Sequence, residues 1–366
     1  MNIILTGITG ILGSQLFYEL LKRDDIELFF LLIRRKGAHM PEDRLQKILR
    51  HPMAPVHVLE NPNSIVKNCK VFELDAFLHP STFLCPSAKN FFIHAASSVN
   101  LNPEDHLKDF LFQENLELTK KLYTTFVPFL SKFTYISTAF CLGNVGGVLD
   151  NNFHNKVANY RNHYEASKHA TEMYLRAQVQ STGVEVQIVR PSILGGTVYN
   201  QEKYFISCYK VYYLLARFFY NNPLARSNSI RVAINSKNTL NIVPVDYAAK
   251  VIAKVFSKNI EQLNIVHPTS TQLLGGLTRI FQAVNFTPYT FIHDVHTEFV
   301  LEYKNKLEEL YYNTIGLHLT PYFLSLPNLY DTRILQSILP CPTYYLEDYL
   351  SQTIRYAIKN KFKNAW

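Results

Sequence analysis

The sequence predicts an α/β protein built on a Rossmann-type, doubly wound parallel sheet, with a smaller and mainly helical C-terminal substrate region. Three observations favour this fold. The chain opens with a short apolar strand, Asn2 to Leu5, of the kind that a parallel sheet buries on both faces. A glycine-rich turn follows, and then a segment with apolar residues at helical spacing. Further apolar strands alternate with helical segments, which is typical of βαβ units.

The turn after the first strand carries glycines at positions 7, 10 and 13. In a dinucleotide-binding turn, Gly7 would permit the tight turn, Gly10 would let the backbone approach a pyrophosphate, and Gly13 would let the helix pack close to the strand. The N-terminus of the helix then offers free N–H groups to the phosphates. Because the turn lies between a strand and a helix, the sequence predicts a dinucleotide site, with a glycine-bearing turn of an unrelated α/β protein as the alternative.

The remaining elements are predicted from apolar runs and helical spacing. Strands are expected at residues 26–33, 71–75, 91–100, 133–143, 187–194, 239–245 and 263–266. Helices are expected at residues 42–49, 109–126, 170–180, 204–219, 251–256, 298–312 and 344–361. Together these strands and helices predict a dinucleotide-binding unit over residues 1–200, which also carries the catalytic residues. A substrate region would cover residues 201–366, of which residues 239–266 return to the first unit.

With 366 residues, 47% of them hydrophobic, the chain is long enough for a sizeable core. The net charge of +8 comes from scattered Lys and Arg, which disfavours nucleic-acid binding and suits anionic small molecules. We expect no metal centre, because the cysteines lie far apart, at positions 69, 85, 141, 208 and 341. No signal peptide is expected, and no apolar run approaches the ~20 residues that span a bilayer. We expect a cytoplasmic protein, with contact to a membrane surface as an alternative role for residues 204–219 or the basic end.

The second strand ends in Arg34, Arg35 and Lys36, with no acidic residue. In dinucleotide-binding folds an acid at this position holds a free ribose 2′-hydroxyl, whereas arginine accommodates a 2′-phosphate. The basic run therefore predicts that the cofactor is NADP(H). A basic turn that faces only solvent is the alternative interpretation.

Two further segments are expected to lie along the cofactor. Asp75 ends the strand at 71–75 and is placed to meet the adenine. Ala95 and Ala96 follow the apolar part of the next strand, where small side chains suit the close passage of a cofactor. His94 precedes them within an apolar strand, so a packed core histidine is favoured over a catalytic base.

The candidate catalytic residues follow the strand at 133–143. This strand runs into the hydroxyl residues Ser137 and Thr138. Tyr164 and Lys168 then stand one helical turn apart on the same face. A nearby ammonium favours the tyrosinate and is expected to lower the pKa of Tyr164, which would make it a proton donor near neutrality. Such a pair alone occurs in many helices, but here it follows a nucleotide-binding turn.

Together these segments resemble the extended short-chain dehydrogenase/reductases. Thr6-Gly-Ile-Thr-Gly-Ile-Leu-Gly13 is similar to their glycine-rich turn, and Tyr164 with Lys168 is similar to their catalytic pair. Within that superfamily the chain resembles the thioester-reductase and fatty acyl-CoA reductase branch, of the male-sterility type. This narrower resemblance rests on residues 94–100, 136–141, 189–194, 241–246 and 330–331.

The resemblance implies a role for each matching residue. Thr138 would hydrogen-bond the substrate carbonyl, Tyr164 would protonate the developing alkoxide, and Lys168 would bind the nicotinamide ribose. Asn115 would match the helix asparagine that supports a water relay. The residues implied to line NADP(H) are Gly7, Thr9, Gly10, Ile11, Leu12, Gly13, Arg34, Arg35, Asp75, Ala95, Ala96, Pro191, Ser192 and Ile193. Ile8 departs from the branch, which usually has alanine there.

The resemblance also implies an activity: NADPH-dependent reduction of an acyl thioester, carried by coenzyme A or a carrier protein, to the aldehyde or the alcohol. The aromatic segment 204–219 would line a channel for a long acyl chain, or would simply be a buried helix. Another extended short-chain enzyme is the first alternative, such as a sugar-nucleotide epimerase or dehydratase, or a hydroxysteroid-type dehydrogenase. A catalytically silent NADP(H)-sensing protein is the second.

Overall fold

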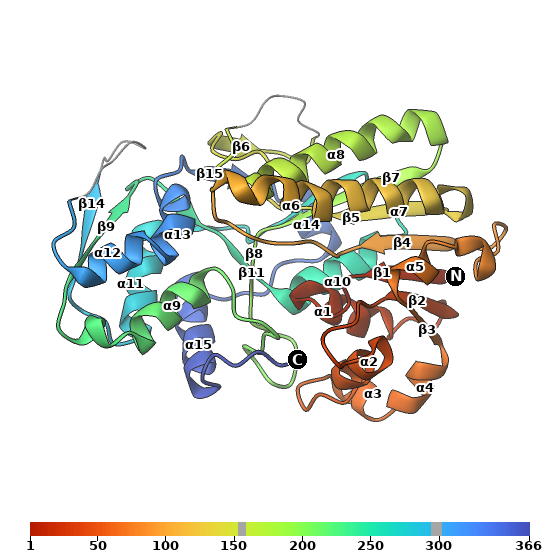
Figure 1. Ribbon diagram of the computed structural model, residues 1–366, viewed down its shortest axis with the longest axis horizontal. Coiled ribbons are helices and arrows are strands. Elements are labelled where there is room, and N and C mark those ends of the chain that lie inside the picture. The colour runs from red at the N-terminus through yellow and green to blue at the C-terminus, as the bar shows by residue number, and fades with distance from the viewer. Residues whose placement is uncertain (153–158, 294–301) are drawn as a thin grey trace.

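The computed structural model describes residues 1–152, 159–293 and 302–366. Within them a seven-stranded sheet forms the centre of the molecule, with every neighbouring pair of strands parallel (Figure 1). Its order is β12-β7-β5-β4-β1-β2-β3. The strands are β1 (Asn2–Thr6), β2 (Leu28–Leu32), β3 (Cys69–Phe72), β4 (Asn90–His94), β5 (Lys132–Ile136), β7 (Glu185–Pro191) and β12 (Gln262–Ile265). The predicted Rossmann-type sheet is confirmed.

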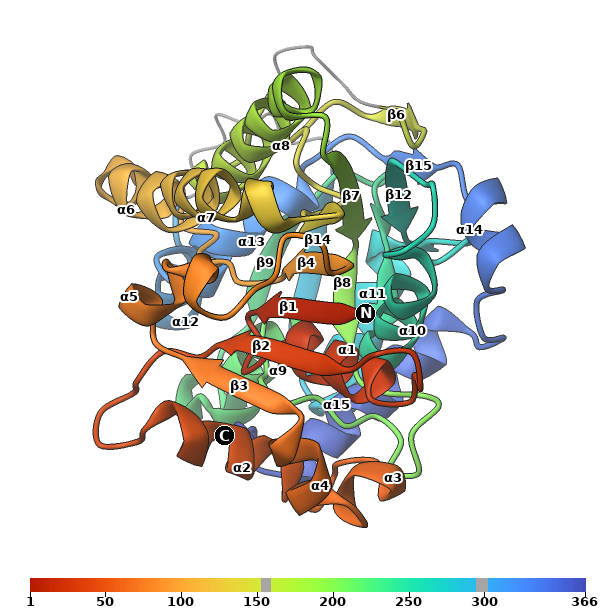
Figure 2. The same ribbon diagram turned by 90° about the vertical axis from the view of Figure 1, so that its right-hand side faces the viewer.

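Helices cover both faces of this sheet, as the doubly wound prediction requires (Figure 2). On one face, α1 (Ile11–Leu20) and α10 (Val245–Val255) pack on Ile3 and Leu5 of β1. On the other face, α7 (Leu118–Phe126) and α8 (His163–Thr182) pack on Ile4. Since successive strand residues point to opposite faces, a strand buried on both sides is rich in apolar residues. This is why β1 and β2 stand out in the sequence as apolar runs.

The glycine-rich turn brings three pieces of backbone into contact. Gly7 has φ +76°, and a Cβ atom there would lie 2.5 Å from the main chain of Ala95 and Ala96, just after β4. A Cβ atom at Gly13 would lie 2.1 Å from the carbonyl oxygen of Gly7. Glycine is therefore required at both positions to join β1, α1 and the end of β4 so closely.

The C-terminal region forms a second apolar core beside the sheet. It contains α9 (Tyr212–Asn221), α11 (Leu273–Ala283), α12 (Lys306–Tyr312), α13 (Ile315–Phe323), α15 (Leu346–Lys359) and the parallel pair β9 (Ile230–Ile234) and β14 (Tyr289–His293). Phe219 and Phe281 lie near its centre, with their rings 5.2 Å apart. Residues 243–266 instead pack in the first core, together with Leu335 of α14 (Arg333–Ile338).

Short strand pairs join the two cores. β8 (Ile193–Gly195) pairs in parallel with β11 (Ile242–Pro244), and β6 (Gly147–Leu149) with β15 (Asn328–Tyr330). β10 (Thr239–Leu240) and β13 (Thr271–Gln272) pair antiparallel. The other α-helices are α2 (Pro41–Leu49), α3 (Val56–Leu59), α4 (Pro62–Lys67), α5 (Leu74–Phe77) and α6 (Lys108–Phe112). No helix in the described part of the chain is both long and apolar enough to cross a membrane.

Several element boundaries differ from the predictions. The strand predicted at 133–143 ends at Ile136, because the next residues form turns in which Cys141 N–H binds the Thr138 carbonyl at 3.2 Å. The helix predicted at 170–180 starts earlier, at His163, where the Asn162 side chain accepts a hydrogen bond from Glu165 N–H at 3.1 Å. Such a cap satisfies an otherwise free N–H group and fixes the helix start.

In the C-terminal half, the helix predicted at 204–219 starts only at Tyr212. Tyr204 and Val211 have positive φ values, 67° and 51°. An α-helix requires negative φ, so the backbone cannot be helical at either residue. Of the helix predicted at 298–312, residues 298–301 lie outside the described residues, and α12 begins at Lys306 after the capping residue Asn305.

We predict that Gly7→Ala destabilises the fold more than Gly183→Ala. Both glycines have positive φ, +76° and +71°, but nothing lies within 4 Å of a Cβ atom at Gly183. Both variants therefore incur the left-handed backbone cost of about 1–2 kcal/mol. Gly7→Ala adds an overpacking cost of about 1–3 kcal/mol. Urea unfolding of the two variants measures the difference, and equal losses of stability would contradict the close packing at Gly7.

Candidate active site

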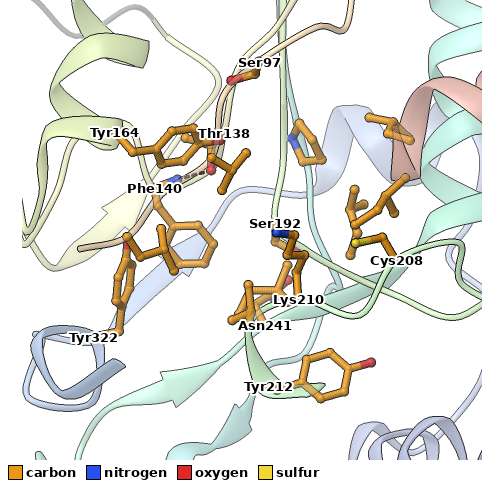
Figure 3. A pocket seen from close by; sticks show the side chains of 18 of the residues that line it. Ser97, Thr138, Phe140, Tyr164, Ser192, Cys208, Lys210, Tyr212, Asn241 and Tyr322 are labelled. Carbon is orange, nitrogen blue, oxygen red and sulfur yellow. Dashed lines mark hydrogen bonds between the residues drawn. The ribbon is translucent and has the colours of Figure 1, made fainter. Parts of the chain in front are cut away.

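A cavity of about 530 Å³ lies where the carboxyl ends of the sheet strands face the C-terminal region (Figure 3). It is lined by the glycine-rich turn, the segment after β5, the start of α8 and the residues after β7 on one side. Residues from α9, α11 and α13 line the other side. Twelve of the predicted site residues line this cavity: Thr9, Gly10, Ile11, Leu12, Gly13, Ala95, Thr138, Tyr164, Lys168, Pro191, Ser192 and Ile193.

Thr138 and Tyr164 lie side by side at the cavity wall (Figure 3). Phe140 N–H donates a hydrogen bond to the Thr138 hydroxyl at 3.3 Å, which holds the turn after β5 in place. Burial is the main influence on Tyr164 and raises its pKa, while a side-chain hydrogen bond with Thr138 opposes this rise. The expected lowering of this pKa by Lys168 is therefore wrong for this arrangement, in which burial favours the neutral phenol.

Lys168 is buried one helical turn beyond Tyr164. Its Nζ donates a hydrogen bond to the Ile136 carbonyl at 2.6 Å and lies 4.2 Å from the centre of the Tyr135 ring. Burial lowers its pKa to about 7, although the nearby Glu172 carboxylate acts in the opposite direction. The ammonium is thus directed at the end of β5, beside the turn that carries Thr138.

A buried ion pair lies behind these residues. Arg190 of β7 donates hydrogen bonds to the Glu172 carboxylate of α8, from Nη2 at 2.7 Å and from Nε at 2.9 and 3.1 Å. Both side chains are buried. Two charges taken out of water are tolerated only when they are paired with good geometry. The pair therefore fixes α8 to the sheet, one turn beyond Lys168.

A second cluster attaches the start of α8 to the C-terminal region. Arg161 binds the Glu165 carboxylate through its backbone N–H and its Nε, both at 2.9 Å. Its guanidinium also lies 4.3 Å from the centre of the Tyr322 ring and donates to the Ser325 hydroxyl at 3.0 Å. Arg161, Tyr322 and Ser325 line the cavity, and no sequence motif had marked them.

Other predicted residues do not line the cavity. Gly7 lies at the start of the turn and Ala96 just after β4, where the backbones of these two segments meet. Asp75 is not at a strand end, because β3 stops at Phe72 and Asp75 lies exposed in α5. Arg34 pairs with Glu114 at 3.0 Å, and Arg35 lies 3.5 Å from Glu73. Both arginines are exposed.

Asn115 does not line the cavity, and its side chain instead connects two elements. It lies in a π-helical turn (Gln113–Glu117). Its amide Nδ2 donates to the Ser98 carbonyl at 3.1 Å and to the Ser167 hydroxyl at 2.9 Å, and its Oδ1 accepts from Ser98 N–H at 2.8 Å. The side chain thereby joins the loop after β4 to α8.

The prediction that His94 is a packed core histidine is confirmed. Its side chain is fully buried and binds the hydroxyls of Thr6 at 2.7 Å and Thr119 at 3.0 Å. Burial lowers its pKa to about 3, so the ring stays neutral.

Several cavity residues were not identified from the sequence as site residues. Lys36, Arg44 and Lys210 supply positive charge, and Asn364 and Trp366 reach the cavity from the end of the chain. Arg44 donates a hydrogen bond to the Arg34 carbonyl at 2.5 Å. Arg44 lies in α2, ten residues after Arg34, and no motif in the sequence had marked it. Trp366 had no sequence signal.

These features define the class of the protein: a Rossmann-type α/β protein with a glycine-rich nucleotide-binding turn and a Thr/Tyr/Lys cluster in one cavity. The chain belongs to the family described as Male sterility protein, an NAD-binding family, which it matches over residues 5–252. This confirms the branch that the sequence motifs indicated.

The relatives differ from this chain in length. Human fatty acyl-CoA reductase 2 is 24% identical over 234 residues, which cover 54% of this chain and 44% of that protein. Fatty acyl-CoA reductase 1 of Rattus norvegicus is 29% identical over 154 residues, which cover 39% of this chain and 29% of that protein. The chain spans about half the length of the curated relatives it matches first.

Solved structures share the fold at low identity. The terminal R domain of the myxalamid PKS-NRPS pathway has a TM-score of 0.68 and 17% identity, covering 100% of this chain and 92% of that one. The UDP-glucuronic acid 4-epimerase of Bacillus cereus, solved with NAD, has a TM-score of 0.63 and 15% identity, covering 99% and 100%. At this identity the likeness concerns the fold alone.

We predict that the free energy of unfolding depends less on pH in Lys168→Met than in the wild type. The pKa of Lys168 is lowered from its usual 10.5 to about 7, so between these values the unfolded chain binds a proton that the folded chain does not. Because of this proton, the free energy of unfolding of the wild type rises with pH, by at most about 1.4 kcal/mol per pH unit. Urea unfolding between pH 7 and pH 9 should show the stability of the wild type rising relative to that of Lys168→Met.

Exposed Lys22, which pairs with Glu19 on the surface, provides the matched control Lys22→Met. Its stability should follow that of the wild type across the same pH range. A constant difference between wild type and Lys168→Met would show that Lys168 is not the titrating group.

Proposed function

We propose that this chain is an NADPH-dependent reductase that converts an acyl thioester to the aldehyde or the alcohol. The observation that carries the proposal is the meeting of three features in one cavity. These are the glycine-rich turn, the adjacent hydroxyls of Thr138 and Tyr164, and an apolar wall from the C-terminal region. Each would serve a different part of the reaction.

The glycine-rich turn fits the pyrophosphate of a dinucleotide. The N-cap residue of α1 is Gly10, which has no side chain to cap the helix, so the first N–H groups of the helix are open to a phosphate. Gly10 through Gly13 line the cavity. Ala95 and Pro191 would border the nicotinamide nucleotide. When bound, the cofactor would supply a hydride to the substrate carbonyl.

The 2′-phosphate would meet the cations beside this turn. Lys36 and Arg44 line the cavity, and Arg34 lies next to them through the hydrogen bond from Arg44. Arg35 lies away from the cavity, beside Glu73. The proposed preference for NADPH therefore depends on Arg44 and Lys36 more than on Arg35.

Thr138 and Tyr164 would act on the carbonyl oxygen of the thioester. The Thr138 hydroxyl would donate a hydrogen bond to this oxygen, and Tyr164 Oη would transfer its proton to it as negative charge develops. The resulting thiohemiacetal would lose the thiol carrier as its C–S bond breaks and the hydroxyl proton passes to the sulfur, which leaves the aldehyde. Reduction of the aldehyde to the alcohol would consume a second NADPH. The raised pKa of Tyr164 keeps the phenol protonated until the substrate oxygen has gained enough negative charge to accept the proton. Lys168 would hydrogen-bond the nicotinamide ribose from its position below.

The acyl chain would lie against the C-terminal region. The far side of the cavity is lined by aliphatic and aromatic side chains from three helices: Leu215, Leu273, Leu277, Ile280, Leu319 and Phe323. A long hydrocarbon chain buries apolar surface against such a wall, whereas a nucleotide sugar would leave polar groups unpaired there. The names of the fatty acyl-CoA reductases and membership in the family support the same substrate.

The proposal predicts that NADPH oxidation depends on acyl length. Because one buried methylene is worth about 0.8 kcal/mol, kcat/KM should rise about threefold to fourfold per added CH₂ until the wall is covered. The measurement is kcat/KM over an acyl-CoA series at fixed NADPH, below micelle-forming concentrations. In the same assay Tyr164→Phe should lower turnover by about 10²-fold or more while cofactor binding persists.

Tyr174→Phe is the matched control, since Tyr174 lies on the same helix but outside the cavity. It should retain wild-type turnover. Wild-type turnover by Tyr164→Phe would overturn the assignment of the proton donor. A flat acyl-length profile, or turnover of nucleotide sugars without net NADPH consumption, would favour another short-chain enzyme. NADP(H) binding without any turnover would favour a sensing protein.

The cofactor preference gives a separate prediction. Charge-assisted hydrogen bonds to a phosphate contribute about 1.5–3 kcal/mol each, so Arg44→Gln should weaken NADPH binding about tenfold or more. NADH binding should change little, since NADH has no 2′-phosphate. Fluorescence titration of both cofactors measures this. Arg23→Gln, which removes a surface partner of Asp25, is the control. A larger effect from Arg35→Gln than from Arg44→Gln would reverse the assignment.

A further inference from the structure

A second hollow lies beside the main cavity, along the outer side of α2. This groove, of about 670 Å³, is lined by His39, Lys47, Arg50 and His51 on one side and by Ala365 and Trp366 on the other. Trp366 also lines the main cavity, so the two hollows adjoin at this residue. The size lies within the usual range for small-molecule sites.

Hydrogen bonds and ring contacts hold Ala365 and Trp366 in place. The indole Nε1 of Trp366 donates to the Thr9 carbonyl of the glycine-rich turn at 3.0 Å. Ala365 N–H donates to the Ser207 carbonyl at 2.9 Å. The His51 ring meets the Trp366 ring edge-on at 5.2 Å and stacks on Phe205 at 5.5 Å. The groove therefore has an aromatic side, formed by Trp366 and His51, next to the nucleotide-binding turn.

The other side of the groove carries two cations, Lys47 and Arg50, and one carboxylate, Asp43. Arg50 donates only to neutral groups, the Gln46 Oε1 and the Asn63 Oδ1, both at 2.8 Å. Lys47 Nζ contacts the ring of His39 at 3.0 Å. Among the described residues neither cation forms an ion pair, and the acid that lines the groove, Asp43, accepts a hydrogen bond from Met40 N–H at 3.3 Å.

We propose that this groove binds the phosphorylated adenosine end of coenzyme A; this inference rests on the proposed function and assigns the carrier of the acyl group. A thioester at Thr138 and Tyr164 would extend through the main cavity to Trp366. Its phosphates would pair with Lys47 and Arg50, and its adenine would stack beside Trp366 and His51. Aromatic rings and paired cations are the groups that recognise a purine and its phosphates.

The adenosine phosphate of NADP(H) offers the same chemistry and is the competing source. Lys36 and Arg44 line the main cavity and are absent from the groove, whereas Lys47 and Arg50 line only the groove. The two sets of cations thus line different hollows, and the proposal requires that two phosphorylated adenosines bind together. An experiment must therefore separate binding beside the cofactor from binding in its place.

Binding is tested with adenosine 3′,5′-bisphosphate in the presence of saturating NADP⁺, by calorimetry and by tryptophan emission. Trp366 is the only tryptophan in the sequence, so its emission reports the groove wall. We expect the bisphosphate to bind and to change this emission. Lys47→Gln combined with Arg50→Gln should weaken its binding at least about tenfold. Lys67→Gln combined with Lys70→Gln, two exposed lysines outside both hollows, is the charge-matched control and should have no effect.

Three results would overturn the inference: displacement of NADP⁺ by the bisphosphate, heat of binding without a change in Trp366 emission, or equal weakening by both double variants. Turnover adds a second readout. The groove variant should raise KM for an acyl-CoA at least about tenfold and leave KM for the corresponding acyl-pantetheine and for NADPH unchanged.

Equal effects on both thioesters would reject the groove while leaving the proposed function intact. Absence of turnover with any thioester would reject the proposed function, and with it the assignment of the groove to an acyl carrier. The calorimetric experiment would still decide whether the groove binds a phosphorylated adenosine.

Discussion

The close contact of three backbones at Gly7 is the constraint on which the rest of the site depends. The carbonyl of Gly7 occupies the space where any side chain at Gly13 would lie, and Gly7 itself leaves no room against Ala95 and Ala96. Because β1, α1 and the end of β4 are held together here, the open N-terminus of α1 points into the cavity.

Helix α8 connects the two cores around this turn. Its first turn is held to the C-terminal region through Arg161 and Tyr322, and its third turn is held to the sheet through Glu172 and Arg190. Tyr164 and Lys168 lie between these two attachments. Their separation from Thr138 is thus set by buried charged contacts on either side, which suits residues that must keep a fixed geometry in a water-poor site.

The sequence was sufficient for features that arise from local chemistry. Glycine spacing predicted the turn, unbroken apolar runs predicted the buried strands, and helical spacing predicted that Tyr164 and Lys168 share a face. Features that arise from tertiary contacts were missed. Asp75 and Arg35 follow their strands in sequence, yet Asp75 lies exposed in α5 and Arg35 beside Glu73. Trp366 reaches Thr9 across almost the whole chain, and the burial that raises the pKa of Tyr164 depends on several elements at once.

The late return of the chain to the first core has a consequence for synthesis. Strand β12 completes one edge of the sheet, and α10 covers the same face as α1, although both follow residues 192–244, in which the second core begins. A nascent chain that has emerged only as far as β7 would expose the apolar faces that these elements later cover. These faces can therefore be covered as they are in the complete fold only once residue 265 has left the ribosome.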